Sequence, residues 1–93
     1  MPEDLKALIA KAAEVLRQEG AREVYVFGSA ATGRLREGSD VDLAVSGLPL
    51  RRYLDALGAV IDILQVPVDL VDLDQETPFP RHLKEEGRLV RVG

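Results

Sequence analysis

The sequence predicts one small α/β domain, because helical and strand patterns alternate along a chain long enough for a single hydrophobic core. Two long segments carry apolar side chains at the spacing of an amphipathic helix, and three short runs are rich in β-branched residues. The whole chain, residues 1–93, is expected to form this one domain. The main elements expected, in order, are a helix over 3–19, strands over 24–27 and 41–45, a helix beginning near Pro49, and a strand over 67–73.

The first half of the chain shows where its helix and first strand end. Gly20 is placed to close the first helix, and the β-branched and aromatic run 24–27 stops at Gly28, as a buried strand does before a turn. A short helix is expected over 30–36 before the second strand. The residues that form the apolar face of the first helix are Leu5, Leu8, Ile9, Ala12, Val15 and Leu16.

The second half continues the alternation. Thr77 and Pro78 are typical of a helix N-cap and first turn, and Gly87 is placed to end that short helix. Residues 89–92 are expected to form a final short strand. The apolar stripe of the second long helix consists of Leu50, Leu54, Leu57, Ile61 and Leu64.

The composition argues against several classes of site and partner. The chain has no cysteine and one histidine, His82, so disulfides and metal sites built from thiolates or imidazoles are not expected. A net charge of −4 argues against general nucleic-acid binding, which requires a concentrated basic surface. No apolar run is long enough to cross a membrane and the acidic N-terminus lacks a secretory signal, so a cytoplasmic protein is expected.

The chemistry is expected at Asp40 and Asp42, where the second strand begins. Since successive strand side chains alternate between faces, the two carboxylates share one face, and Val41 and Leu43 share the other. Neighbouring carboxylates repel each other unless a cation lies between them, and such oxygen ligands suit Mg²⁺ or Mn²⁺. An Asp-x-Asp is also an everyday pattern on a half-exposed strand, so the motif alone is a weak signal.

The loop after the first strand carries a second motif, which strengthens the signal of the two aspartates. Gly28 lets the backbone approach a phosphate, and the amides that follow, with the Ser29 hydroxyl, can donate to its oxygens. Gly33 is expected to permit a sharp turn in this loop, and Ser39 adds a hydroxyl at its end. These four residues are the candidate binding residues of the loop, with a simple turn role as the alternative for Ser39.

The motif Gly28-Ser29, followed after ten residues by Asp40-Val41-Asp42, resembles that of the nucleotidyltransferase superfamily that includes DNA polymerase beta. Residues 26–45 look like its minimal nucleotidyltransferase (MNT) branch of prokaryotes, and the resemblance covers most of the chain. It implies the nucleotidyltransferase fold, a small mixed β-sheet with helices packed mainly on one face. That arrangement would leave the aspartate face open to substrate.

The resemblance also implies a third metal-binding carboxylate at Asp69, in the expected strand over 67–73. The alternation of this strand agrees, because Asp69 falls on the face opposite Val68 and Leu70. Asp72 is the competing candidate, but it shares the phase of the core residues and lies near the strand end, where aspartate is a routine turn residue. Asp69 is therefore preferred.

The resemblance implies Mg²⁺-dependent transfer of a nucleoside monophosphate, AMP from ATP, to an acceptor hydroxyl. Asp40, Asp42 and Asp69 would be the catalytic residues and would hold two Mg²⁺ ions, while Gly28 and Ser29 would bind the β- and γ-phosphates. Family members are often encoded beside a small HEPN-domain protein as antitoxin and toxin, and some antitoxins add AMP to a tyrosine of the toxin. A HEPN-domain partner encoded nearby is therefore implied.

One departure from the family pattern concerns the triphosphate. The family often has an arginine just before the second glycine of the loop, where this chain has Thr32, with Arg34 and Arg36 after Gly33. Either arginine could replace the missing contact, or both could be solvated surface residues. This departure leaves open a non-catalytic binding module that masks a HEPN toxin without chemistry, although the intact set of three aspartates favours the enzyme. Self-association is also left open, because no interface signature is visible.

Overall fold

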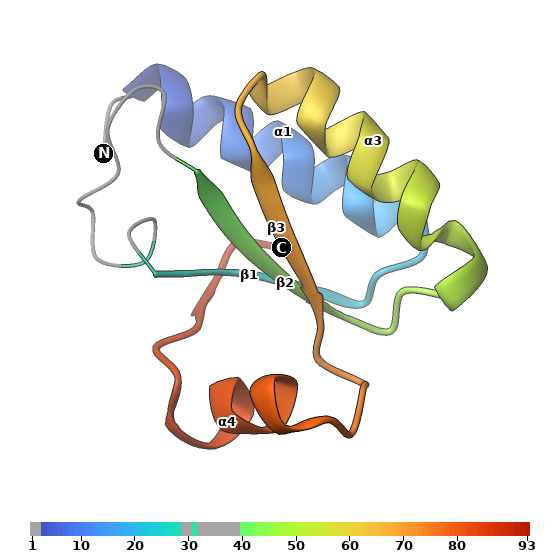
Figure 1. Ribbon diagram of the computed structural model, residues 1–93. Helices are drawn as coiled ribbons and strands as arrows, with labels where there is room; N and C mark the ends of the chain where they lie inside the picture. The colour runs from blue at the N-terminus through green and yellow to red at the C-terminus, as the bar shows by residue number, and fades with distance from the viewer. Residues whose placement is uncertain (1–2, 29–30, 32–39) are drawn as a thin grey trace.

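Helices and strands alternate along the chain, as the apolar patterns predict (Figure 1). The structure is a computed structural model, and it describes residues 3–28, 31 and 40–93. Except for Ala31, the short helix expected over 30–36 lies outside these residues. The elements are α1 (Glu3–Gln18), β1 (Glu23–Phe27), β2 (Val41–Ser46), the 3-10 turn η1 (Leu50–Arg52), α3 (Tyr53–Leu64), β3 (Val68–Asp72), α4 (Pro78–Glu86) and β4 (Val90–Arg91).

The four described strands form one mixed sheet in the order β3-β2-β1-β4. β1 pairs antiparallel with β2 and β4, whereas β2 pairs parallel with β3. Parallel neighbours need a crossover connection, and η1 with α3 supplies it between β2 and β3. The structure therefore confirms the expected mixed sheet and the expected short strand near the end of the sequence.

Helices α1 and α3 cover one face of the sheet (Figure 1). This face holds the main core, because the alternate strand residues that point toward the two helices are apolar and buried. The buried strand residues are Val24 and Val26 of β1, Val41, Leu43 and Val45 of β2, and Leu70 of β3. The buried helix residues include Ile9, Ala12, Ala13 and Leu16 of α1 and Ala56, Val60 and Leu64 of α3.

Helix α4 lies on the opposite side of the sheet from α1 and α3 (Figure 1). Its Leu83 is buried against Phe27, Ala44 and Leu73, which form a second and smaller core. Two of the three described α-helices therefore pack on one face, as expected. The expectation of an open aspartate face is only partly correct, because α4 covers one end of that face.

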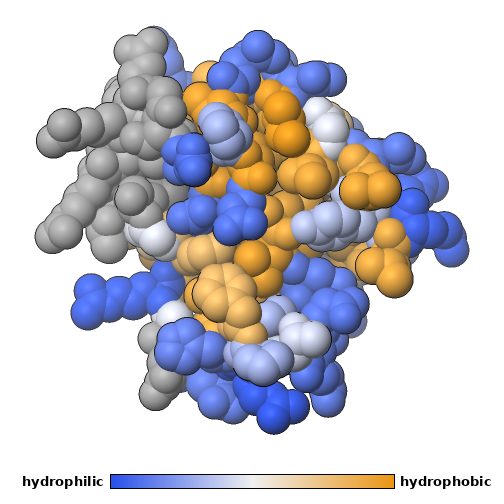
Figure 2. Space-filling view, viewed as in Figure 1, coloured by the Kyte–Doolittle hydropathy of each residue, from blue (hydrophilic) through white to orange (hydrophobic). Residues whose placement is uncertain are grey.

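Apolar side chains also remain exposed along the outer side of η1 and α3. Leu50, Leu54 and Ile61 lie there, and Figure 2 shows hydrophobic surface over these elements. For these three residues the predicted packing of the apolar stripe on the sheet was wrong, because the buried face of α3 carries Ala56, Val60 and Leu64 instead. Within residues 3–28 and 40–93, no helix combines the length and hydropathy that a membrane span requires.

Candidate active site

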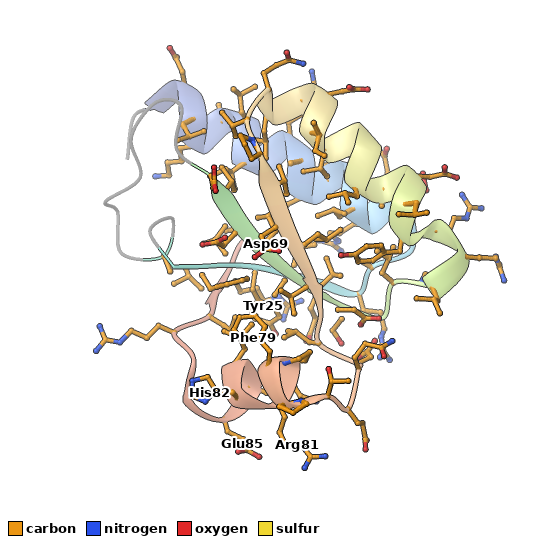
Figure 3. All side chains as sticks on the ribbon, in the orientation of Figure 1. Tyr25, Asp69, Phe79, Arg81, His82 and Glu85 are labelled. Atoms are coloured by element: carbon orange, nitrogen blue, oxygen red, sulfur yellow. The ribbon has the colours of Figure 1, made fainter. Side chains whose placement is uncertain are left out.

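Two of the three aspartates singled out in the sequence lie side by side on neighbouring strands. Asp42 of β2 and Asp69 of β3 are register partners in the parallel ladder, and such strands run about 5 Å apart. Their strand neighbours, among them Val41 and Leu70, point into the main core, so both carboxylates project from the other face. Figure 3 shows Asp69 on the side of the sheet that faces α4.

The electrostatics of this pair are unfavourable for an ionised carboxylate. Burial raises the pKa of Asp42, and the negative charges of Asp69 and Asp40 raise it further. Asp42 is half-buried, whereas Asp40 and Asp69 are exposed. The site therefore carries excess negative charge around the half-buried Asp42 carboxylate.

Gly28 brings the loop after β1 into direct contact with Asp42. Its φ is +63°, in the left-handed region that favours glycine, and a Cβ added there would lie 2.4 Å from Asp42 Oδ2. The preceding residue, Phe27, is the register partner of Asp42 in the β1–β2 ladder. The Gly28 carbonyl also accepts a hydrogen bond from Ala31 N at 3.2 Å, which turns the chain directly after the strand. A side chain at this position would strain the left-handed backbone and displace the Asp42 carboxylate, so glycine is strongly favoured.

The remaining candidate residues fall into two groups. Asp40 directly precedes β2 and is close enough to act on the charge of Asp42. Ser29, Gly33 and Ser39 lie outside the described residues, as do Thr32, Arg34 and Arg36. Among residues 3–28, 31 and 40–93, no three His, Cys, Asp or Glu side chains are clustered as a metal site requires. The assembled part of the site is therefore the Asp42–Asp69 pair with Gly28 beside it.

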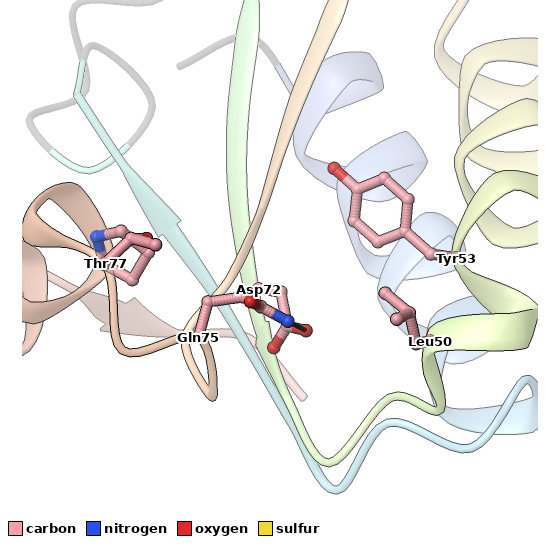
Figure 4. Close-up of a pocket in the computed structure, with 6 residues that line it drawn as sticks. Leu50, Tyr53, Asp72, Gln75 and Thr77 are labelled. Atoms are coloured by element: carbon pink, nitrogen blue, oxygen red, sulfur yellow. Dashed lines mark hydrogen bonds between the residues drawn. The ribbon is translucent and has the colours of Figure 1, made fainter.

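Asp72 has a structural role that agrees with its place at the end of β3. Its Oδ1 accepts a hydrogen bond from Asp74 N at 2.9 Å, and its Oδ2 accepts one from Gln75 Nε2 at 3.4 Å. It also lines a shallow pocket of about 340 Å³ at the edge of the sheet, between η1 and the start of α4 (Figure 4). The other lining residues are Leu50, Tyr53, Gln75, Thr77 and Pro80.

Two aromatic residues near the carboxylates were not predicted from the sequence. The Tyr53 hydroxyl donates a hydrogen bond to the Leu70 carbonyl, next to Asp69, and burial together with the charges of Asp69 and Asp72 raises the pKa of Tyr53. Phe79 of α4 packs against Phe27. Tyr53 is not part of the apolar stripe predicted from the sequence, although it packs against the main core, whereas Phe79 stands out only as an aromatic between two prolines.

The sequence matches a known family over nearly its whole length. Residues 10–91 match the family model described as polymerase beta, nucleotidyltransferase. A solved structure of a protein assigned as a minimal nucleotidyltransferase is 33% identical, covers 89% of this chain and 92% of its own, and superposes with a TM-score of 0.67. No curated protein matches the sequence at a significant level.

Two solved toxin–antitoxin structures share the fold at lower identity. A toxin–antitoxin complex with AMP-PNP has a TM-score of 0.69 and 23% identity, over 95% of this chain and 72% of that chain. A tri-AMPylated HEPN toxin in complex with an MNT antitoxin, from Shewanella oneidensis, has a TM-score of 0.69 and 21% identity, over 96% and 71%. Because the family match spans almost the entire domain, the chain belongs to the polymerase beta family of nucleotidyltransferases.

Proposed function

We propose that this protein transfers a nucleoside monophosphate, AMP from ATP, to an acceptor hydroxyl. The observation that carries the proposal is the register pairing of Asp42 with Asp69, directly beside the left-handed Gly28. Two carboxylates that repel each other lower the stability of the free domain, so their position beside Gly28, where a backbone can approach a phosphate, supports a role in chemistry.

The donor set of this site suits Mg²⁺. It consists of carboxylate oxygens, and burial and the two neighbouring charges all act to raise the pKa of Asp42, as expected for a site completed by a cation. Asp40, Asp42 and Asp69 would hold the metal. When bound, Mg²⁺ supplies positive charge that stabilises the entering and leaving oxygens of the transfer.

The chain's own residues position the reactants. The Gly28 backbone, together with Ser29, would bind the β- and γ-phosphates and leave the α-phosphate near Asp42. Asp69 is exposed on the edge strand β3, where an acceptor can reach it, and would take the proton of the attacking hydroxyl. The acceptor oxygen then bonds to the α-phosphorus, the bond to the β-phosphate oxygen breaks, and pyrophosphate leaves.

The acceptor we propose is a tyrosine of a HEPN-domain partner encoded nearby, with this protein as the antitoxin. A domain of this size has little surface of its own for binding an acceptor, which favours a hydroxyl presented by a partner protein. Two toxin–antitoxin structures that share this fold support the proposal, and one of them contains an AMPylated HEPN toxin.

The reaction can be tested with ATP labelled at the α- or the γ-phosphate. The purified protein is incubated with Mg²⁺ and a lysate of its source organism, and labelled bands are compared. We expect transfer from the α-position alone and its loss when Mg²⁺ is chelated. Asp69→Asn should lose the label, whereas Asp62→Asn, an exposed aspartate on α3, serves as the matched control. Absence of any label that depends on Asp69 would favour the non-catalytic binding module instead.

A further inference from the structure

An exposed aromatic ring lies beside the carboxylate face. Phe79, in the first turn of α4, keeps 51% of its surface in contact with solvent. All four aromatic residues of the chain belong to the described part, and Phe79 alone among them is exposed. The other exposed large apolar residues described lie on η1, α3 and β4, so Phe79 is the one on this side of the molecule.

A short chain of contacts connects Phe79 to the site. Its ring packs against that of Phe27 with a centroid distance of 6.3 Å and an interplanar angle of 62°. Phe27 is in turn the register partner of Asp42 and the residue before Gly28. Phe79 therefore lies one aromatic ring away from both the carboxylates and the start of the phosphate loop, and Figure 3 shows it on the α4 side with Asp69.

The position of Phe79 is held by its surroundings, while much of its ring remains accessible. Pro78 and Pro80 flank it and fix the backbone of this first helical turn, and Pro80 and Leu83 are buried on α4. The edge contact with Phe27 restrains the ring from one side. A restrained aromatic surface of this kind loses little conformational entropy when a flat ligand stacks on it.

We propose that Phe79 is the stacking platform for the nucleobase of the donor triphosphate. The inference rests on the proposed function: with the phosphates at Gly28 and the α-phosphate near Asp42, the base needs an apolar surface within one nucleotide of the carboxylates. Aromatic stacking tolerates any base, because every base has a π-face, and favours the larger ring system. Phe79 would therefore give a preference for purines over pyrimidines and little discrimination between ATP and GTP.

The first test compares a ligand with a base to one without. Binding of ATP and of inorganic tripolyphosphate, each with Mg²⁺, is measured for the wild type, Phe79→Ala and the control Leu54→Ala on exposed α3. We expect Phe79→Ala to weaken ATP binding about tenfold, leaving tripolyphosphate unchanged, and Leu54→Ala to change neither. Unchanged ATP binding by Phe79→Ala, or an equal loss for both ligands, would overturn the inference. Failure of the wild type to bind either ligand would instead remove the proposed function, and this inference with it.

A second test places a reporter at the stacking position. The chain contains no tryptophan, so Phe79→Trp introduces a single indole that can itself stack on a base. ATP and GTP should quench its fluorescence more strongly than CTP, and tripolyphosphate should leave it unchanged, while ATP affinity stays close to that of the wild type. Equal quenching by tripolyphosphate and ATP would show that the indole senses phosphate binding rather than the base, which contradicts the proposal.

Discussion

At the scale of single residues, the surroundings of Asp42 disfavour its charge. Asp42 is half-buried and lies opposite Asp69, so its ionised form is unfavourable in the metal-free protein and would be stabilised by a bound cation. Strand alternation predicted that Asp40 and Asp42 share a face, and it placed Asp69 opposite its own core residues. It could not predict that Asp42 and Asp69 are register partners, because strand order is decided by contacts distant in sequence. The position of Phe79 near the site could not be predicted either, because its contact with Phe27 also joins segments distant in sequence.

The conflict at Asp42 predicts that Asp42→Asn stabilises the metal-free protein at neutral pH. The folded-state pKa of Asp42 is raised, so its stabilising contribution is complete below a pH of about 4 and is lost as pH rises through the raised value. Removing the charge should raise the free energy of unfolding by about 0.5 kcal/mol at pH 7, the size of a cross-strand charge pair. Thermal unfolding at pH 7 and pH 3 should show the gain at the higher pH only. A loss of stability at pH 7 would contradict this account of the pair.

Gly28 and Gly58 form a matched pair of glycine substitutions. At Gly28 the φ of +63° and the nearby Asp42 carboxylate both oppose a side chain, so Gly28→Ala should destabilise the protein by about 1–2 kcal/mol. Gly58 lies inside α3, and beyond the adjacent helix backbone an added Cβ would meet no atom within 4 Å, so Gly58→Ala should stabilise by about 0.5–1 kcal/mol. Urea unfolding of both variants measures the two effects. Equal effects of the same sign would show that Gly28 is an ordinary turn glycine.

At the scale of elements, periodicity and turn residues located most helices and strands to within a residue or two. The helix expected from Pro49 begins with the 3-10 turn η1 before α3, and Thr77, Pro78 and Gly87 bound α4 as expected, although Thr77 forms no side-chain cap hydrogen bond. The side of the sheet that α4 covers could not be predicted. That choice depends on Leu83 meeting Phe27, Ala44 and Leu73, which come from separate parts of the sequence.

Tyr53 joins two elements at the edge of the sheet. Its hydroxyl donates to the Leu70 carbonyl of the edge strand β3, and burial together with the charges of Asp69 and Asp72 raises the pKa of this hydroxyl. Tyr53→Phe should therefore cost about 1 kcal/mol, because it leaves the carbonyl without this donor. Unfolding measurements give the cost, and faster amide hydrogen exchange in β3 than in β1 would localise it. A variant as stable as the wild type would show that water replaces the hydroxyl fully.

At the scale of the whole molecule, the sheet separates stability from chemistry. The main core lies under α1 and α3, and the carboxylates lie on the other face of the sheet. Helix α4, with Phe79, covers one end of that face. The alternation of helical and strand patterns predicted the α/β class, and the family resemblance implied the mixed sheet. The separation explains how a domain of 93 residues can hold a charged site without burying it in its core.

This separation predicts that ligands stabilise the molecule through the carboxylate face alone. Mg²⁺ with ATP should raise the melting temperature of the wild type, because a ligand that binds the folded state shifts the unfolding equilibrium. Asp42→Asn should lose most of this shift, and Leu54→Ala on the opposite face should keep it. Equal shifts in both variants would place nucleotide binding away from the carboxylates.

We propose that Asp42 serves nucleotidyl transfer and that its charge lowers the stability of the metal-free fold. The most direct test measures label transfer from α-labelled ATP and thermal unfolding on the same preparation of Asp42→Asn. We expect transfer to fall about 100-fold or more, as when an electrostatic group is removed from a transition state, while the melting temperature without metal equals or exceeds that of the wild type. Transfer at the wild-type rate by this folded variant would show that Asp42 takes no part in the reaction.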